Sequence, residues 1–153
     1  MLYTVGHGLL SGETLIANLS RHGIDLVVDV RSQPVSTRAP HFNRELLKRA
    51  LEASGISYAW MGQALGGRPP SRLRTRAGAP DYERMAQEPA TVSALDRLAG
   101  AAASRKIALL CSESRPELCH RTLMLEPQLE MRSATVEHIL PEGGLLARPT
   151  LFA

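Results

Sequence analysis

The stretch Leu26-Val-Val-Asp-Val-Arg31 decides the fold of this chain, because its first five residues form a near-continuous apolar run. Such a run is typical of a parallel strand that helices cover on both faces. The stretch Ile107-Ala-Leu-Leu-Cys111 has the same character. We therefore predict that both segments are strands of a sheet with two buried faces.

Three other segments have strand patterns, at residues 2–5, 56–60 and 136–140. Helical patterns run from a Ser11 cap to Gly23, from an Asn43 cap to Gly55, and from about Asp81 to Ala102 with a break at Pro89. Strands that alternate with helices need crossover connections and so form a mostly parallel sheet. We predict one three-layer α/β domain over residues 1–140, with a mostly parallel five-stranded sheet in the order 3-2-1-4-5. An irregular tail follows at 141–153.

The chain has 153 residues, which suits one domain with a substantial core. Its N-terminus lacks the basic segment and apolar run of a signal peptide, and no stretch approaches the roughly 20 apolar residues of a membrane span. We expect a cytoplasmic protein without membrane contact, in which the two cysteines stay reduced.

Positive charge gathers in one part of the chain. Residues 31–76 hold nine basic and two acidic side chains, a net charge of +7, whereas the whole chain carries +3. Such an asymmetry favours an anionic partner, either a small molecule or a nucleic acid. The long loop at 61–80 is rich in Gly, Pro and Arg, with Trp60, Tyr82 and Phe42 near it. Bases could stack on these aromatic rings, although such a loop is more often a solvated flap.

Polar side chains follow three of the predicted strands: His7 the first, Asp29 and Arg31 the second, and Cys111 with Glu113 the fourth. Open parallel sheets bind ligands beyond the carboxyl ends of their strands. We therefore expect these groups to converge on one crevice.

Asp29 and Arg31 are two residues apart on a strand, so both side chains point to the same face. Asp29 could orient Arg31 for bidentate contact with a phosphate or carboxylate, or the two could form a structural ion pair. His7 lies in a Gly6-His7-Gly8 turn, where it could move a proton or serve only the structure.

The segment Cys111-Ser-Glu-Ser-Arg-Pro-Glu-Leu-Cys119-His120-Arg121 is the most informative of the chain. A helix is predicted from Glu117 to about Leu125, with Pro116 opening it and Pro127 ending or kinking it. Cys119 would then lie in the first helical turn, near cations that favour the thiolate.

Four interpretations of the cysteines stay open. Cys119 is a nucleophile with His7 or His120 as proton carrier, or it forms a redox pair with Cys111. Alternatively, both cysteines and a histidine bind zinc, or both merely pack in the core. The spacing fits no familiar Cys-x-x-Cys knuckle, so we predict neither a metal nor another cofactor.

At these residues the chain resembles the uncharacterised bacterial family catalogued as domain of unknown function 488. The resemblance lies in Thr4-Val-Gly-His7-Gly, Gly23-Ile-Asp-Leu-Val-Val-Asp29-Val-Arg31-Ser-Gln-Pro34, Phe42-Asn43, Gly55-Ile-Ser-Tyr58, Leu65-Gly-Gly-Arg68 and Cys111-x-Glu113-x-x-Pro116-x-x-Cys119-His120-Arg121. These motifs span nearly the whole chain, but the family has no settled activity. The resemblance therefore indicates where the site lies and leaves the reaction open.

Two weaker similarities point elsewhere. Val28-Asp-Val-Arg31 and a cysteine at a strand end look faintly like rhodanese-type sulfur transferases, whose compact cysteine loop has a different spacing. The end of the chain, Arg148-Pro-Thr-Leu-Phe152, looks like a degenerate sliding-clamp-binding peptide without its leading Gln. A terminal hydrophobic anchor is the simpler interpretation of these last residues.

Our first hypothesis is an enzyme that acts on a phosphate-bearing substrate, a nucleotide or a nucleic-acid end. The alternatives are a non-catalytic nucleic-acid-binding or repair-accessory module and a thiol redox or sulfur-transfer protein. The candidate residues are His7, Glu113, Cys119 and His120 for catalysis, Arg31, Arg68 and Arg121 for anion binding, and Asp29 and Cys111 in support.

Overall fold

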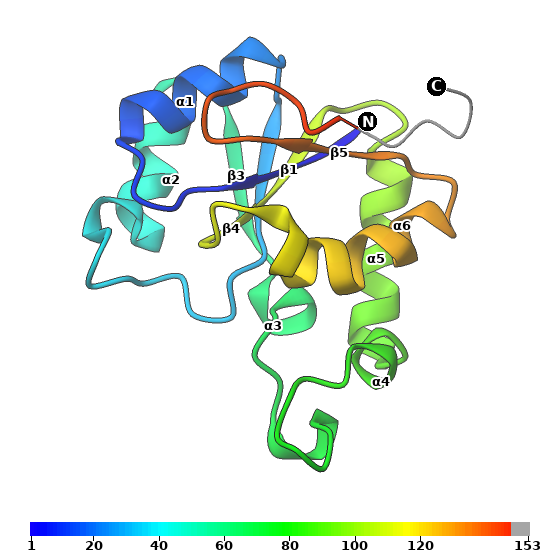
Figure 1. Cartoon of the computed structure of the whole chain (residues 1–153). Helices are drawn as coiled ribbons and strands as arrows, with labels where there is room; N and C mark the ends of the chain where they lie inside the picture. The colour runs from blue at the N-terminus through cyan, green and yellow to red at the C-terminus, as the bar shows by residue number, and fades with distance from the viewer. Residues whose placement is uncertain (148–153) are drawn as a thin grey trace.

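The computed structural model describes residues 1–147 and contains one five-stranded, all-parallel sheet (Figure 1). Its strands are β1 Leu2–Gly6, β2 Leu26–Asp29, β3 Ser57–Trp60, β4 Ile107–Cys111 and β5 Val136–Ile139. The α-helices are α1 Gly12–Arg21, α2 Arg44–Ala53, α3 Gly62–Leu65, α4 Tyr82–Ala86, α5 Pro89–Ala101 and α6 Glu126–Glu130. The predicted α/β class with helices on both sides of a parallel sheet is confirmed.

The sheet has a separate hydrophobic core on each face. On one face, Leu15 and Leu19 of α1 and Leu47 and Leu51 of α2 pack over Val27 of β2. The other core joins α3, α4, α5 and α6 to alternate strand residues, among them Leu2, Val28, Ile107 and Leu109. Because side chains alternate along a strand, a run of apolar residues supplies both cores at once.

The predicted strand order was wrong in one respect. The observed order is β3-β2-β4-β1-β5, so β4 lies between β2 and β1. Ile107 therefore pairs with Leu2 on one side and with Leu26 on the other. Hydrophobic periodicity reports that a strand has two covered faces, but it does not report which strands are its neighbours. The central place of β4 puts the Cys111 end of this strand in the middle of the carboxyl edge.

The segment after β4 also differs from the prediction of a helix from 117 to 125. Residues Pro116–Leu118 form a 3-10 turn, Cys119 is extended, and a π-helical turn, Arg121–Leu125, leads into α6. Pro127 neither ends nor kinks the helix before α6, because it lies in the first turn of α6, where the missing N–H needs no partner. The 3-10 turn and the π-helical turn are short and have different helical geometries, so the apolar pattern of the sequence made them look like one helix.

The loop at 61–80 is more ordered than predicted, since α3 and a 3-10 turn at Ser71–Leu73 occupy part of it. Within the predicted tail, Leu145 bridges Ile139 of β5 and Leu146 donates to the His138 carbonyl. The proposed clamp-binding peptide at 148–152 lies outside the described residues. No helix within residues 1–147 has the length and apolar character that crossing a membrane requires.

Candidate functional site

A polar cleft of about 310 Å³ lies beyond the carboxyl ends of β1, β2 and β4. Its lining comes from residues that follow these strands, from the turn after α3, and from the segment Leu118 to His120. Its lining includes the predicted residues His7, Arg31, Arg68, Cys111, Glu113, Cys119 and His120, together with Ser32, Gln33, Ser36, Gly67 and Tyr82. The structure therefore brings the imidazole of His7, the guanidinium of Arg31 and the thiol of Cys119 to one pocket.

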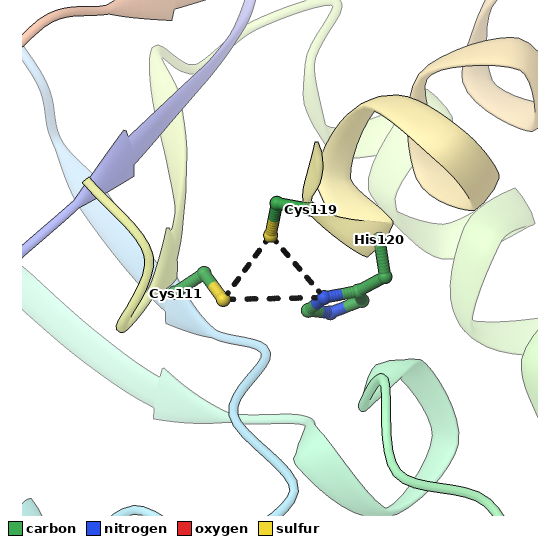
Figure 2. A group of neighbouring side chains, drawn as sticks. All are labelled: Cys111, Cys119 and His120. Atoms are coloured by element: carbon green, nitrogen blue, oxygen red, sulfur yellow. Dashed lines mark hydrogen bonds between the residues drawn. The ribbon is translucent and has the colours of Figure 1, made fainter. Parts of the chain in front are cut away.

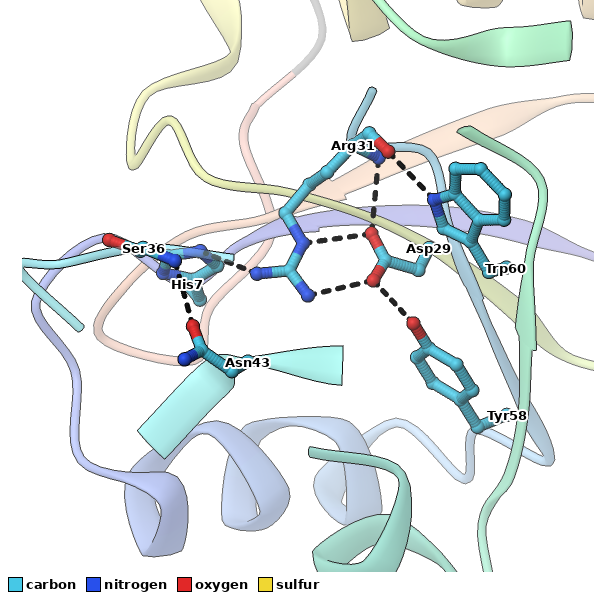
Figure 3. Close-up of polar contacts among 7 residues, drawn as sticks. All are labelled: His7, Asp29, Arg31, Ser36, Asn43, Tyr58 and Trp60. Carbon is cyan, nitrogen blue, oxygen red and sulfur yellow. Dashed lines mark hydrogen bonds and ion pairs between the residues drawn. The ribbon is translucent and has the colours of Figure 1, made fainter. Parts of the chain in front are cut away.

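Arg31 is held from one side by Asp29 (Figure 3). The Nε and one terminal nitrogen of Arg31 donate to the two carboxylate oxygens of Asp29 at 2.9 and 2.7 Å, and both side chains are buried. Tyr58 of β3 donates its hydroxyl proton to Asp29 at 2.6 Å, and burial together with this bond raises the pKa of Tyr58. The ion pair is therefore fixed, and the remaining nitrogen of Arg31 is directed towards His7.

His7 has one defined tautomer. Its Nδ1 lies 2.9 Å from the Gly8 carbonyl oxygen, which can only accept, so Nδ1 carries the proton. Its Nε2 lies 3.3 Å from a terminal nitrogen of Arg31, which can only donate, so Nε2 presents a lone pair. Burial of the ring, assisted by the charge of Arg31, lowers the pKa of His7. His7 is therefore a neutral imidazole with a basic nitrogen at the cleft.

The lowered pKa of His7 predicts a pH dependence of stability. Below its ordinary value of 6.5 the unfolded chain binds this proton more readily than the folded one, so the free energy of unfolding falls as the pH falls. One proton limits this slope to about 1.4 kcal/mol per pH unit. In urea unfolding between about pH 7 and 5, His7→Gln should show a shallower fall than the wild type. The exposed His41 provides the control variant, His41→Gln, and equal slopes for wild type and His7→Gln would contradict the assignment.

The two cysteines and His120 form a compact cluster at one wall of the cleft (Figure 2). The Sγ atoms of Cys111 and Cys119 lie 3.4 Å apart, and Nδ1 of His120 lies 3.9 and 3.5 Å from them. All three residues are buried, and both cysteines are free thiols. Gly67 leaves room for the imidazole, because a Cβ at this position would lie 2.9 Å from the His120 ring.

Cys119 is the thiolate of this pair. The hydrogen bond with Cys111, that from His120, and the backbone N–H and positive charge of Arg121 together lower the pKa of Cys119, against the effect of burial. The bond to Cys119 and burial raise the pKa of Cys111. The metal-free cluster therefore holds one thiolate and one thiol, which makes Cys119 nucleophilic and a good metal ligand.

Arg121 does not line the cleft, in contrast to its predicted role in anion binding. Its side chain is fully buried and donates to Cys119 Sγ at 3.4 Å, to Thr4 Oγ1 at 3.2 Å and to the Glu113 carbonyl at 2.6 Å. Thr4 also bonds to His138 at 2.6 Å. The three hydrogen bonds of the Arg121 guanidinium all go to acceptors inside the protein. Arg121 therefore positions the thiolate and does not contact a ligand.

The family model described as Domain of unknown function DUF488 matches residues 11–126. The chain belongs to this family. No curated protein and no solved structure matches the chain. The matched range of the DUF488 chain includes Arg31, Arg68 and the Cys111–Arg121 segment, whereas His7 precedes it.

Two further predicted residues of this DUF488 chain are exposed at the cleft. Arg68 lines the cleft, and its side chain is exposed. Its backbone N–H donates to the Ser32 hydroxyl at 3.0 Å. Glu113 is also exposed there, while its carbonyl holds Arg121. A cation and a carboxylate thus line the same opening.

The aromatic residues near the loop do not form a platform for bases. Phe42 is fully buried and packs on the ring of His7 at a centroid distance of 4.7 Å. Trp60 donates to the Arg31 carbonyl and lies under the guanidinium of Arg44. Only Tyr82 of the three lines the cleft. Two of the loop arginines are also engaged, Arg72 by Glu88 and Arg74 by backbone carbonyls.

Sequence reasoning missed several contributors to the site. Tyr58 holds Asp29, Gly67 makes room for His120, and Ser32 and Ser36 add hydroxyl groups to the cleft. Tyr58 and Gly67 lie inside motifs that carry the family resemblance, and these motifs could have indicated both residues as parts of the site. The serines follow Arg31 in a segment without regular structure, where no periodicity indicates the direction of a side chain.

Proposed function

We propose that the protein is an enzyme that acts on a phosphate-bearing substrate, a nucleotide or a nucleic-acid end, bound in the polar cleft. The observation that carries this proposal is the convergence of Arg31, Arg68 and neutral His7 with the thiol–imidazole cluster in one opening. Guanidinium groups bind phosphate with strong, charge-assisted hydrogen bonds. A cytoplasmic location agrees with this proposal, because the reduced thiols of the cluster persist there.

Each group has a defined task in this proposal. Arg31, held in place by Asp29, and the exposed Arg68 bind phosphate oxygens from two sides of the cleft. His7 Nε2, which accepts from Arg31 in the free protein, exchanges that bond for a proton from an attacking group once Arg31 binds the phosphate. The cluster of Cys111, Cys119 and His120 is the reacting centre beside the bound phosphate.

The test is binding of inorganic phosphate and a panel of nucleotides, measured by calorimetry. Arg68→Ala should weaken binding about 10- to 100-fold, since a hydrogen bond to a charged group contributes about 1.5–3 kcal/mol. Arg76→Ala makes the same change of charge at an exposed position outside the cleft and should leave binding unchanged. Equal loss in both variants would favour a non-specific nucleic-acid-binding module, and no binding by the wild type would refute the proposal.

A thiol redox role is the second candidate, because the two sulfur atoms lie 3.4 Å apart and Cys119 is a thiolate. A disulfide has an S–S distance of about 2.05 Å, so only a small approach is needed. Treatment with a disulfide oxidant should then remove two hydrogens from the wild-type mass and none from Cys111→Ser. If the wild type keeps two free thiols under these conditions, the redox role is excluded.

A further inference from the structure

The sulfur–nitrogen cluster described above has the composition of a transition-metal site. Its donors come from two places in the fold, Cys111 from the end of β4 and Cys119 with His120 from the turn before the π-helical segment. The Sγ atoms and one His120 nitrogen all lie within 4.8 Å of one another. The prediction of no metal relied on spacing along the chain, and that argument fails because the strand end and the turn meet in space.

The distances within the cluster fit the edges of a tetrahedron around zinc. Zn–S and Zn–N bonds of about 2.3 and 2.05 Å place two sulfurs about 3.8 Å apart and a sulfur and a nitrogen about 3.6 Å apart. The observed separations are 3.4 Å between the sulfurs and 3.5 and 3.9 Å from sulfur to nitrogen. Each agrees to within about 0.4 Å. We propose that Cys111, Cys119 and His120 bind one Zn²⁺ ion, with the fourth coordination position open to the cleft.

The surroundings support the ligands in this role. Arg121 and its backbone N–H bond to Cys119, as outer partners do around metal-bound thiolates. The His120 ring lies against Gly67 with Nδ1 facing the sulfurs, while its buried Nε2 has no hydrogen-bond partner among the described residues. The direction of the ring is therefore set by its contacts with Gly67 and the sulfurs. Two soft thiolates with one imidazole favour zinc over magnesium or calcium.

Three protein ligands with an open position are the arrangement of a catalytic zinc, whereas structural sites have four. Glu113 and Arg31 line the same cleft as the three proposed ligands. A bound Zn²⁺ adds positive charge beside Arg31 in the same cleft. This makes the cleft more favourable for an anion, and we infer that a phosphate oxygen is the fourth ligand, a step that depends on the proposed function.

The test is titration of the metal-free, reduced protein with Co²⁺, which replaces zinc and reports its ligands by absorption. We expect one equivalent to bind and to give a thiolate-to-cobalt charge-transfer band together with intense visible bands of a four-coordinate site. Cys111→Ser, Cys119→Ser and His120→Gln should each weaken binding by at least about 100-fold, since even outer partners contribute about 10- to 100-fold. His41→Gln, outside the cluster, should bind like the wild type.

A wild type that gives no charge-transfer band refutes the metal site. Should a variant fail to fold, the wild type alone decides: one equivalent of Zn²⁺ must protect both thiols from alkylation, and unprotected thiols overturn the proposal. Phosphate added to the cobalt protein tests the fourth ligand. A change in the visible bands supports it, whereas unchanged bands refute phosphate coordination and leave the three-ligand site intact. Because the metal site is tested by the cobalt titration before any phosphate is added, and the calorimetry above uses no metal, the two proposals fail separately.

Discussion

Replacing Arg121 by alanine should lower the free energy of unfolding by about 3–5 kcal/mol, the cost of removing one partner from a buried charged pair. Arg121 is the largest fully buried side chain among the described residues, and it bonds to a thiolate, a hydroxyl and a carbonyl. Its loss leaves the Cys119 charge without its cation and the Glu113 carbonyl without a donor. The pKa of Cys119 should rise as well, because Arg121 is one of the groups that lower it.

Urea unfolding of the reduced, metal-free protein measures this change. The matched control is Arg115→Ala, which removes an exposed arginine from the same segment and should alter stability by no more than about 0.5 kcal/mol. If the two variants lose the same stability, Arg121 does not have the structural role assigned to it.

Replacing Gly6 by alanine should have a comparable effect on stability. A Cβ at this position would lie 1.6 Å from the Glu113 carbonyl oxygen and 3.0 Å from Arg121. Because the obstacle is backbone, the chain after β4 must move, and the bond from Arg121 to that carbonyl is lost with it. Overpacking costs about 1–3 kcal/mol, and the lost buried hydrogen bond adds about 1–3 kcal/mol.

Thermal and urea unfolding of Gly6→Ala should be compared with those of Gly100→Ala. Gly100 lies within α5, and no atom lies within 4 Å of a Cβ built there. Alanine has the higher helix propensity, so this control should gain about 0.5–1 kcal/mol. A Gly6→Ala protein as stable as the wild type would show that the loop after β4 yields easily, contrary to the packing described above.

The fold class could be predicted because the apolar runs at β2 and β4 and the amphipathic helices each carry a local signal. Helix α1 begins after Ser11, whose hydroxyl accepts from the Thr14 N–H, and Gly23 follows it with a positive φ of 68°, as the pattern indicated. Asn43 precedes α2 as predicted, but its side chain accepts from the Ser36 N–H instead of capping the helix. Strand order depends on tertiary packing, and the sequence carries no local signal for it.

The location of the site could be predicted for a similar reason. Parallel strands all end at one edge, so the residues after β1, β2 and β4 meet whether β4 lies beside β2 or beyond β1. His7, Arg31 and Cys111 therefore converge in spite of the wrong strand order. The direction of each side chain could not be predicted in the same way. Arg121 turns inward only because a thiolate and a carbonyl, each from a distant turn, need a donor.

The cysteine segment shows the limit of pattern reading most clearly. A continuous helix from 117 to 125 would carry Cys119 within it, whereas the extended backbone at Cys119 places its sulfur against Cys111. The 3-10 and π-helical turns on either side have no periodicity of their own to detect. This irregular backbone brings the two sulfurs and the imidazole nitrogen to the positions that a metal ion would need.

The contact of the glycine turn after β1 with the loop after β4 has a thermodynamic consequence for ligand binding. Gly6 and Gly8 lie directly against Glu113 and Ser114, the His7 amide donates to the carbonyl of Cys111 at the end of β4, and the Gly8 amide donates to that of Ser112. His7 and the cysteine cluster therefore belong to one rigid unit, which loses little conformational entropy when a ligand binds. Hydrogen–deuterium exchange should already be slow at these amides in the free protein and should change little on saturation.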